Sequence, residues 1–249
     1  MISRALLRCL LVFCAVGSVQ AQTFSVAVPP LTSLLEEDGS GVYQQLLDRA
    51  LDPTDVELEQ RFYPYRRALR VFEERDADCL LSLTDVLLSR FDKDELVYSF
   101  PLGKFVFHIF TPADEPPIDS VAALEGLSVG GIMGHEVYLQ PLLGDIEVDQ
   151  VRSEAQAVQM LELGRLDAVV AALPDIKPFL HRLNYAVESP LLESYDRLNC
   201  HATESNQAFV EALSDKLKQL KTEGAYREEA GPLYVPFSPD ASEHPLPDR

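Results

Sequence analysis

Hydrophobic and polar residues alternate along several short stretches in the first third of the chain, and stretches with helical spacing separate them. Alternation predicts a half-buried strand, whereas apolar residues three and four positions apart predict one face of a helix. The predicted elements, in chain order, are strand 23–28, helix 42–51, strand 56–62, helix 64–74 and strand 79–83. This β-α-β-α-β order predicts a parallel sheet with right-handed crossover connections.

A proline-rich break around Pro112, Pro116 and Pro117 separates this first set of elements from a second set. The elements around and after the break are strand 105–110, helix 121–126, strand 127–132, a loop and helix over 134–143, strand 147–151, helix 154–163, strand 168–173, a helix opened by Pro174, and short strands at 185–187 and 197–202. A last amphipathic helix is predicted over 206–220 and has no strand partner in the second set. These patterns predict an α/β fold of two lobes, each with its own sheet, between which the chain crosses twice.

The two ends of the chain carry patterns that are not typical of a folded domain. Residues 1–8 hold two arginines and no acid, residues 9–16 are apolar, and Val19 and Ala21 are small. This order is typical of a cleavable signal peptide, predicted at 1–21, and it predicts export to the periplasm. Residues 236–249 are rich in proline and aspartate with little to bury, which predicts a disordered tail.

Charge and cysteine content narrow the classes of partner. The chain has 40 acidic and 21 basic residues, a net charge of −19, which argues against nucleic acid and anionic membranes as partners. Cys9 and Cys14 lie in the predicted signal peptide. The remaining Cys79 and Cys200 form either one disulfide or two buried thiols. The cysteines do not have metal-binding spacing, and no metal or cofactor is expected.

Four segments follow one another with a recurring order of residue types. They are Tyr63-Pro64-Tyr65-Arg66-Arg67-Ala68-Leu69 with Asp76-Ala77-Asp78, then Ser82-Leu83-Thr84 with Arg90 and Tyr98-Ser99-Phe100-Pro101-Leu102, then Leu124-Glu125-Gly126-Leu127-Ser128-Val129-Gly130, and finally Leu161-Glu162-Leu163-Gly164-Arg165-Leu166-Asp167-Ala168-Val169-Val170. In this order they resemble motifs of the family 3 extracellular solute-binding proteins, the periplasmic receptors of amino-acid-type import systems. The resemblance extends over almost the whole chain after residue 21.

This resemblance implies the type II periplasmic binding fold, in which two β-α sheets are joined by a two-segment hinge. The implied lobes are 22–110 with 195–235 for lobe one, and 111–194 for lobe two. A small-molecule ligand would be held between the lobes, where open α/β sheets also bind ligands on general grounds. The strand returning from lobe two would lie beside strand 79–83, which implies a disulfide between Cys79 and Cys200.

One departure from the family's pattern concerns the group that holds a ligand carboxylate. In the amino-acid binders of the family, an arginine three residues after the threonine grips the α-carboxylate through a bidentate ion pair. Here the next arginine after Thr84 is Arg90. Arg90 either fills this role from a longer loop or is a surface residue that pairs with Asp92 or Asp94.

A second departure concerns the acid that holds the α-ammonium group in the family. This acid would fall at Ala172, and the nearest carboxylate is that of Asp175, beyond Pro174. A buried ammonium group without a charged partner is costly. We therefore expect a ligand with an anionic or strongly polar group that is not a simple α-amino acid.

Other candidate residues open helices beside the predicted cleft. Tyr65 would form an aromatic wall and Arg67 an anion clamp, unless they serve packing within lobe one and surface charge. The loop of Gly134, His135 and Glu136 precedes a helix, and its N–H groups suit an anion unless it is only an N-terminal turn. The full set of candidate ligand-binding residues is Tyr65, Arg67, Ser82, Thr84, Arg90, Gly134, His135, Glu136 and Asp175.

The sequence therefore predicts a periplasmic solute-binding protein that captures a small polar or anionic molecule without converting it. A monomer is expected, with the membrane permease complex of an ABC-type importer as its partner. One alternative is a ligand-binding sensory module without its own transporter. Another is a periplasmic dehydratase on the same fold, which would need a general acid in the cleft. No catalytic residue is assigned.

Overall fold

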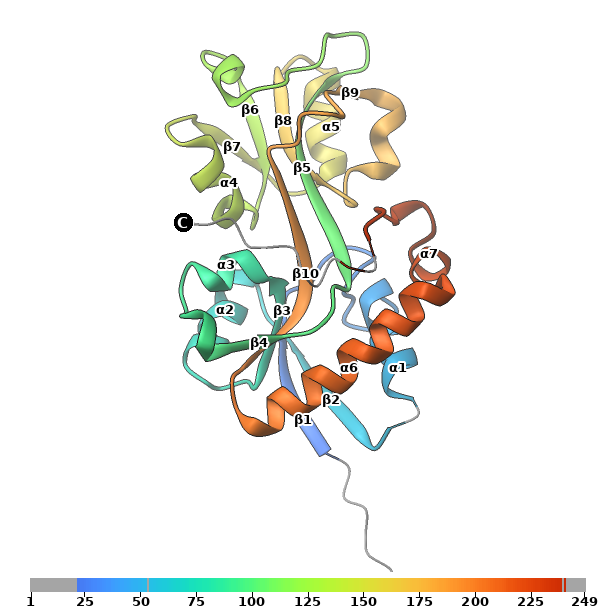
Figure 1. The fold of residues 1–249 in the computed structure, drawn as a ribbon. Coiled ribbons are helices and arrows are strands. Elements are labelled where there is room, and N and C mark those ends of the chain that lie inside the picture. The colour runs from blue at the N-terminus through green and yellow to red at the C-terminus, as the bar shows by residue number, and fades with distance from the viewer. Residues whose placement is uncertain (1–21, 53, 239, 241–249) are drawn as a thin grey trace, which may run out of the picture.

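A computed structural model describes residues 22–52, 54–238 and 240, which form two lobes stacked end to end (Figure 1). The predicted signal peptide, 1–21, lies outside the described residues. Within the described part of the chain, no helix is long and apolar enough to cross a membrane.

Lobe one contains the first set of elements together with the C-terminal helices. Its elements are β1 (Gln22–Val28), α1 (Val42–Leu51), β2 (Val56–Phe62), α2 (Tyr65–Glu73), β3 (Cys79–Leu83), α3 (Thr84–Leu88), η1 (Lys93–Glu95), β4 (Leu96–Tyr98), α6 (Glu204–Glu223), α7 (Ala225–Ala230) and η4 (Gly231–Leu233). The stretches with strict alternation, 23–28 and 56–62, form strands as predicted, because each has one face on the core and one toward solvent or helices.

Two long strands, β5 (Gly103–Pro112) and β10 (Leu192–His201), run from one lobe into the other (Figure 1). The elements of lobe two are η2 (Val121–Leu124), β6 (Val129–Ile132), α4 (Glu136–Leu143), β7 (Val148–Val151), α5 (Glu154–Glu162), β8 (Ala168–Leu173), η3 (Lys177–Arg182) and β9 (Leu183–Tyr185). The chain thus crosses between the lobes twice, as predicted. The proposed lobe limits near 110 and 195 fall within these two crossing strands.

The strands pair in the order β2-β1-β3-β10-β5-β8-β6-β7, with β4 added to β10 and β9 added to β5. Pairing is parallel within each lobe, at β2-β1-β3 and at β8-β6-β7, and antiparallel wherever a crossing strand takes part. The expectation of a separate sheet for each lobe is wrong in this respect. Hydrogen bonding is unbroken from one lobe to the other, because β5 and β10 pair with each other.

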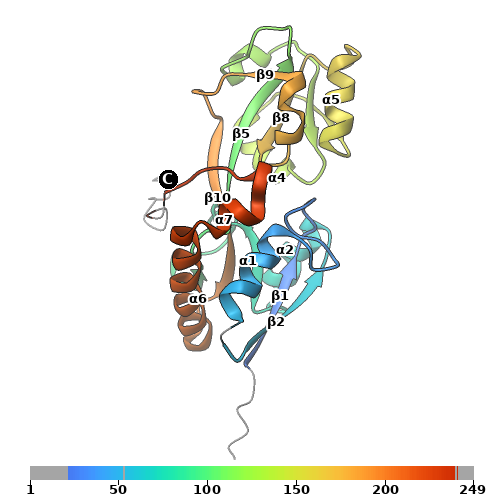
Figure 2. The same ribbon diagram turned by 90° about the vertical axis from the view of Figure 1, so that its right-hand side faces the viewer.

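The helix predicted over 206–220 is the central part of α6, which packs on lobe one beside α1 (Figure 2). Its buried face includes Phe209, Leu213 and Leu217. The ring of Phe209 stacks on that of Phe24 in β1, with centroids 4.1 Å apart. This contact is the reason that the C-terminal helix belongs to lobe one, since burial of its apolar stripe requires the first sheet.

Cys79 and Cys200 form the predicted disulfide, with an Sγ–Sγ distance of 2.01 Å. They lie opposite each other in the antiparallel pair of β3 and β10, and both are fully buried. The bond closes a loop with a sequence separation of 121, which contains all of lobe two. It therefore fixes the returning crossing strand to the sheet of lobe one.

Several segments differ from the sequence-based prediction. The helix expected from Pro174 is a 3-10 helix that begins at Lys177, and the peptide bond before Pro174 is cis. The short helices α3 and α7 were not predicted. Order also extends past residue 235, because the ring of Phe237 packs against Tyr226, with centroids 5.8 Å apart, and lies 3.5 Å from Nζ of Lys221. Residues 239 and 241–249 of the predicted tail lie outside the described residues.

Candidate functional site

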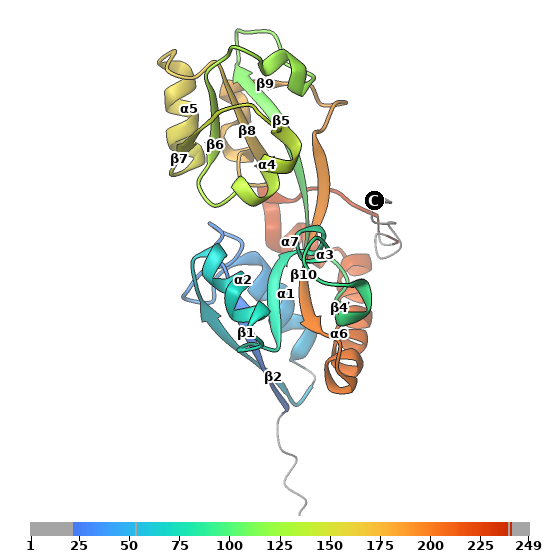
Figure 3. The same cartoon turned by 90° about the vertical axis from the view of Figure 1, so that its left-hand side faces the viewer.

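A cavity of about 650 Å³ lies between the two lobes. Its walls come from the segments that follow β1, β6, β7 and β8 and from the first turn of α2, which lie at the carboxyl ends of parallel strands in both lobes. Figure 3 shows α2 of lobe one and α4 of lobe two facing each other across this region. Since ligands of α/β sheets bind at the carboxyl ends of the strands, we take this cleft as the candidate site.

The lobe-one wall is built from the first residues of α2. The hydroxyl of Tyr65 lies 2.8 Å from Oγ of Ser82 in β3, and burial raises the pKa of Tyr65. The ring of Tyr65 also meets that of Tyr138 in lobe two, with centroids 5.7 Å apart. The guanidinium of Arg66 pairs across the cleft with Glu136, with Nη2 to Oε1 at 3.1 Å. This turn therefore contacts lobe two directly.

The lobe-two wall includes the turn between β6 and α4. Gly134 has φ of 96°, a left-handed conformation that favours glycine, and its N–H donates to Oε2 of Glu136 at 2.6 Å. Burial opposes ionisation of Glu136, but bonds from backbone N–H groups and from Arg66 lower its pKa overall. The sequence analysis expected the N–H of Gly134 to bind an anionic ligand. In the structure this N–H already donates a hydrogen bond to the carboxylate of Glu136.

His135 lies in the same turn and is only 8% exposed. Burial lowers its pKa to about 4, so the ring is neutral at neutral pH. Its Nδ1 has no hydrogen-bond partner among the described residues. The ring packs edge-on to Phe107 of the crossing strand β5, with centroids 6.0 Å apart. A neutral imidazole with an unused nitrogen is therefore part of the cleft wall.

Glu154 and Asp175 line the cleft, and a third carboxyl group, that of Asp196, lies near Asp175. Glu154 opens α5, Asp175 follows β8, and Asp196 belongs to the crossing strand β10. Burial raises the pKa of all three; the nearby charges of Glu154 and Asp196 raise the pKa of Asp175 further, well above its ordinary value. Asp196 has a pKa of about 7, although a hydrogen bond with Tyr43 works in the opposite direction. Carboxyl groups are therefore concentrated in and near the cleft, and burial disfavours their ionised forms.

The structure brings Tyr65, Gly134, His135, Glu136 and Asp175 together as lining residues of the cleft. The other four candidates of the sequence analysis have partners elsewhere, and none of them is among the described residues that line the cleft. They are Ser82, which bonds with Tyr65; Thr84, whose Oγ1 donates to Asn199 Oδ1 at 2.7 Å; Arg67, whose guanidinium lies 5.2 Å from the ring centroid of Tyr63; and Arg90, whose Nη1 pairs with Glu73 Oε1 at 2.7 Å. The surface partner of Arg90 is thus Glu73 rather than Asp92 or Asp94.

Sequence reasoning missed several residues in and near the cleft. Arg66 was passed over for its neighbour Arg67, and Glu154 was read only as part of a helix start after Ser153. Tyr138 was not considered, although its position in the first turn after His135 places it on the same face of α4. Asp196 carried no signal, because the predicted strand began one residue later.

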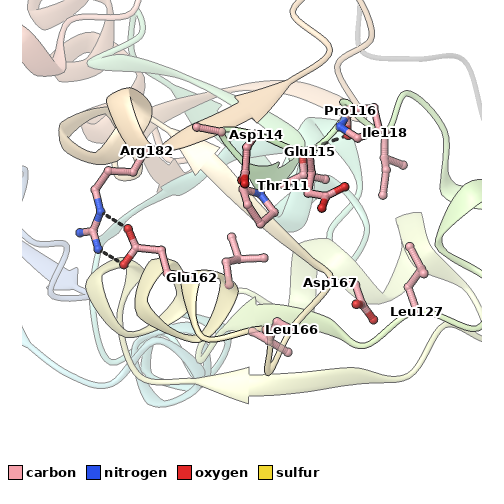
Figure 4. A pocket seen from close by; sticks show the side chains of 14 residues that line it. Thr111, Asp114, Glu115, Pro116, Ile118, Leu127, Glu162, Leu166, Asp167 and Arg182 are labelled. Atoms are coloured by element: carbon pink, nitrogen blue, oxygen red, sulfur yellow. Dashed lines mark hydrogen bonds and ion pairs between the residues drawn. The ribbon is translucent and has the colours of Figure 1, made fainter.

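A second cavity of about 700 Å³ lies on the outer side of lobe two (Figure 4). It is lined by the loop that includes Asp114 and Glu115 and by residues at the amino ends of β6 and β8, such as Leu127 and Asp167. Figure 4 shows the double ion pair between Arg182 and Glu162 at one side. This cavity lies at the amino ends of the lobe-two strands, whereas the cleft lies at their carboxyl ends.

Comparison with known proteins supports this description of the fold. No family model and no curated protein matches the sequence. The GluR0 ligand-binding core from Nostoc punctiforme in complex with (L)-glutamate is similar in structure, with a TM-score of 0.66, 17% identity, and coverage of 86% of this chain and 100% of that chain. ArgBP from T. maritima, as a mutant, gives a TM-score of 0.61 and 18% identity over 85% of this chain and 94% of that chain. A histidine kinase sensor domain with similarity to periplasmic binding proteins gives 0.61 and 15% identity over 87% and 99%. The chain therefore has the two-lobed type II periplasmic binding fold.

Proposed function

We propose that this protein captures a small polar solute between its two lobes, closes on it, and releases it unchanged. The observation that carries the proposal is the cleft of about 650 Å³, which is lined by segments at strand ends of both lobes. A volume of this size suits a small molecule. The ligand-binding names of the structural neighbours agree with this assignment.

The contacts across the cleft fit a closing motion. Arg66 and Glu136 pair between the lobes, and the side chain of Arg66 remains 75% exposed. An ion pair this exposed contributes little free energy, so opening the lobes would cost little at this point. The crossing strands β5 and β10 are the elements that would bend. Such a hinge lets a bound solute shift the equilibrium toward the closed form by its own contacts with both walls.

We propose Tyr65, Gly134, His135, Glu136 and Asp175 as ligand contacts. Ser82 and Thr84 would act by holding Tyr65 and the end of β3 in place, which follows from their hydrogen bonds. Arg67 and Arg90 would reach a ligand only after leaving Tyr63 and Glu73.

The destination of the solute separates two versions of the proposal. Export by the predicted signal peptide would place the protein in the periplasm, where it would deliver solute to a membrane permease complex of an importer. The similarity to a histidine kinase sensor domain favours, as a second version, a sensory module. Uptake of labelled ligand by cells that lack the protein distinguishes them. Loss of uptake is expected for an importer, and unchanged uptake for a sensor.

A thermal-shift screen of the exported chain, residues 22–249, against amino acids, polyamines, carboxylates and sugars tests the proposal. A ligand at 100 times its dissociation constant is expected to stabilise the protein by about 2.7 kcal/mol. The shift should be lost in Tyr65→Ala and kept in Asp114→Ala, which alters the second cavity instead. A shift that survives Tyr65→Ala but not Asp114→Ala would place binding outside the cleft and contradict the proposal.

A further inference from the structure

We infer that the solute is a small organic cation, held by Glu154 and Asp175 with the rings of Tyr65 and Tyr138 beside it. The inference rests on the proposed function and names the class of ligand for the same cleft. It differs in charge from one of the two kinds of ligand that the sequence analysis expected, which were an anionic molecule and a strongly polar one.

The first support is the crowding of carboxyl groups inside the cleft. Glu154 and Asp175 both line it, from the segments after β7 and β8. Burial raises both pKa values, and the charge of Glu154 raises that of Asp175 further. Two desolvated carboxylates near each other repel, and a positive group between them removes both the repulsion and part of the desolvation cost. Glu154 lies in the first turn of α5, where a helix favours an acidic side chain. The position of Asp175 near Glu154 does not have this explanation.

An independent observation is the unpartnered nitrogen of His135. This side chain lines the same cleft, is only 8% exposed, and has no hydrogen-bond partner at Nδ1 among the described residues. A buried polar atom without a partner is costly. One nitrogen of the neutral ring carries a proton and the other accepts a hydrogen bond; with the proton on Nε2, Nδ1 would accept from the N–H of an ammonium or guanidinium group.

The arginines near the cleft do not balance these acids. Arg66 is paired with Glu136, whose second oxygen accepts from the N–H of Gly134. The two arginines on which the anionic ligand was predicted, Arg67 and Arg90, lie against Tyr63 and Glu73. Arg152 lines the cleft as an exposed side chain next to Glu154 in sequence. Apart from the Arg66–Glu136 pair, the described charged residues that line the cleft are then one exposed cation, Arg152, and two partly buried acids, Glu154 and Asp175.

The aromatic side chains indicate an organic cation rather than a bare metal ion. The rings of Tyr65 and Tyr138 meet from opposite lobes at an interplanar angle of 59° with centroids 5.7 Å apart, and Phe179 lines the same cleft. Aromatic faces attract organic cations through their quadrupole. The volume of about 650 Å³ also exceeds what a single ion needs. The hydroxyl of Thr84 donates to Asn199, and neither Thr84 nor Arg90 is among the described residues that line the cleft. The carboxylate contact expected from the resemblance therefore has no counterpart there.

Calorimetric titration of the exported chain with agmatine, putrescine, choline and succinate tests the inference. Agmatine and putrescine are cations without a carboxylate, choline is a quaternary ammonium ion, and succinate is an anion of comparable size. We expect at least one of the cations to bind and succinate not to bind. Asp175→Asn and Glu154→Gln should each weaken that binding roughly 10- to 100-fold, since each removes a charged hydrogen bond. Asp114→Asn, which removes an exposed acid at the second cavity, should leave the affinity unchanged.

The outcomes separate this inference from the proposed function. Binding of succinate without binding of any cation would overturn the inference and leave the cleft as a solute site. Failure of all three cations would also overturn it, while the broader thermal screen decides whether the cleft binds another class of solute. A cation that binds equally well to wild type, Asp175→Asn and Glu154→Gln would overturn it as well. Both variants are expected to fold, because each new side chain keeps the shape of the one it replaces. Circular dichroism melting checks this.

Discussion

Asp196 lies on the crossing strand β10, where it pairs with Gly103 of the other crossing strand and with Leu83 of β3. Its side chain is only 4% exposed, and Oδ2 has no hydrogen-bond partner among the described residues. Burial raises its pKa from 3.8 to about 7. The groups that face it are the hydroxyl of Tyr43, whose own pKa burial raises well above the ordinary value, and the carboxyl of Asp175. We predict that Asp196→Asn stabilises the protein, and more so as the pH rises.

The sign follows from the pKa in the two states. In the unfolded chain the carboxyl loses its proton near its ordinary pKa of 3.8, but in the folded protein it keeps it until about pH 7. Between these limits the folded state holds the extra proton, so the contribution of Asp196 to stability falls as the pH rises and is constant above the upper limit. Each pH unit corresponds to about 1.36 kcal/mol. From about pH 5 to about pH 8, wild type should therefore lose about 3 kcal/mol relative to the variant.

Urea denaturation followed by circular dichroism at both pH values measures this difference. Comparing variant and wild type at each pH cancels the titration of groups that behave alike in the two proteins. Asp114→Asn makes the same chemical change at an exposed acid, and its difference from wild type should not depend on pH. A difference between Asp196→Asn and wild type that stays constant from about pH 5 to about pH 8 would refute the reasoning.

Three further predictions concern stability. Replacing Cys79 and Cys200 by alanine should lower the unfolding free energy by about 4–5 kcal/mol, measured by denaturation, because the bond closes a loop with a sequence separation of 121; a loss below about 1 kcal/mol would contradict this. Gly103→Ala places a Cβ 2.1 Å from the hydroxyl oxygen of Tyr43 and should cost about 1–3 kcal/mol; an unchanged melting temperature would show that the Tyr43 side chain moves aside without cost. Phe237→Ala should cost about 1–2 kcal/mol through lost apolar burial, whereas a change near zero would show that the segment after residue 235 does not pack.

The elements that sequence predicted well are those whose pattern is local. The alternation over 56–62 and the apolar stripe of α6 each require only one buried face, and both are found in the structure. The five-residue helix α3 is too short to show helical spacing. The full length of β5 and β10 also depends on the other strand, because residues such as Gly103 and Asp196 are held by pairing across the lobe boundary. A single-sequence pattern does not contain that information.

The candidate site shows the same limit at the level of single residues. Loops that follow strands were correctly expected to meet between the lobes, and five of the nine candidates line the cleft. The choice between Arg66 and Arg67 depends on where α2 begins, because adjacent helical residues point about 100° apart. Glu154 and Asp175 follow two different strands, and Asp196 lies within a third strand, so only the folded chain brings the three carboxyl groups together.

The position of a bound ligand tests the proposed binding site most directly. A crystal structure of residues 22–249 with the tightest-binding compound is expected to show the compound between the lobes, in contact with Tyr65 and with the carboxyl groups of Glu154 and Asp175. A compound bound in the second cavity beside Asp114 and Arg182, with the cleft between the lobes left empty at saturating concentration, would contradict the proposed site.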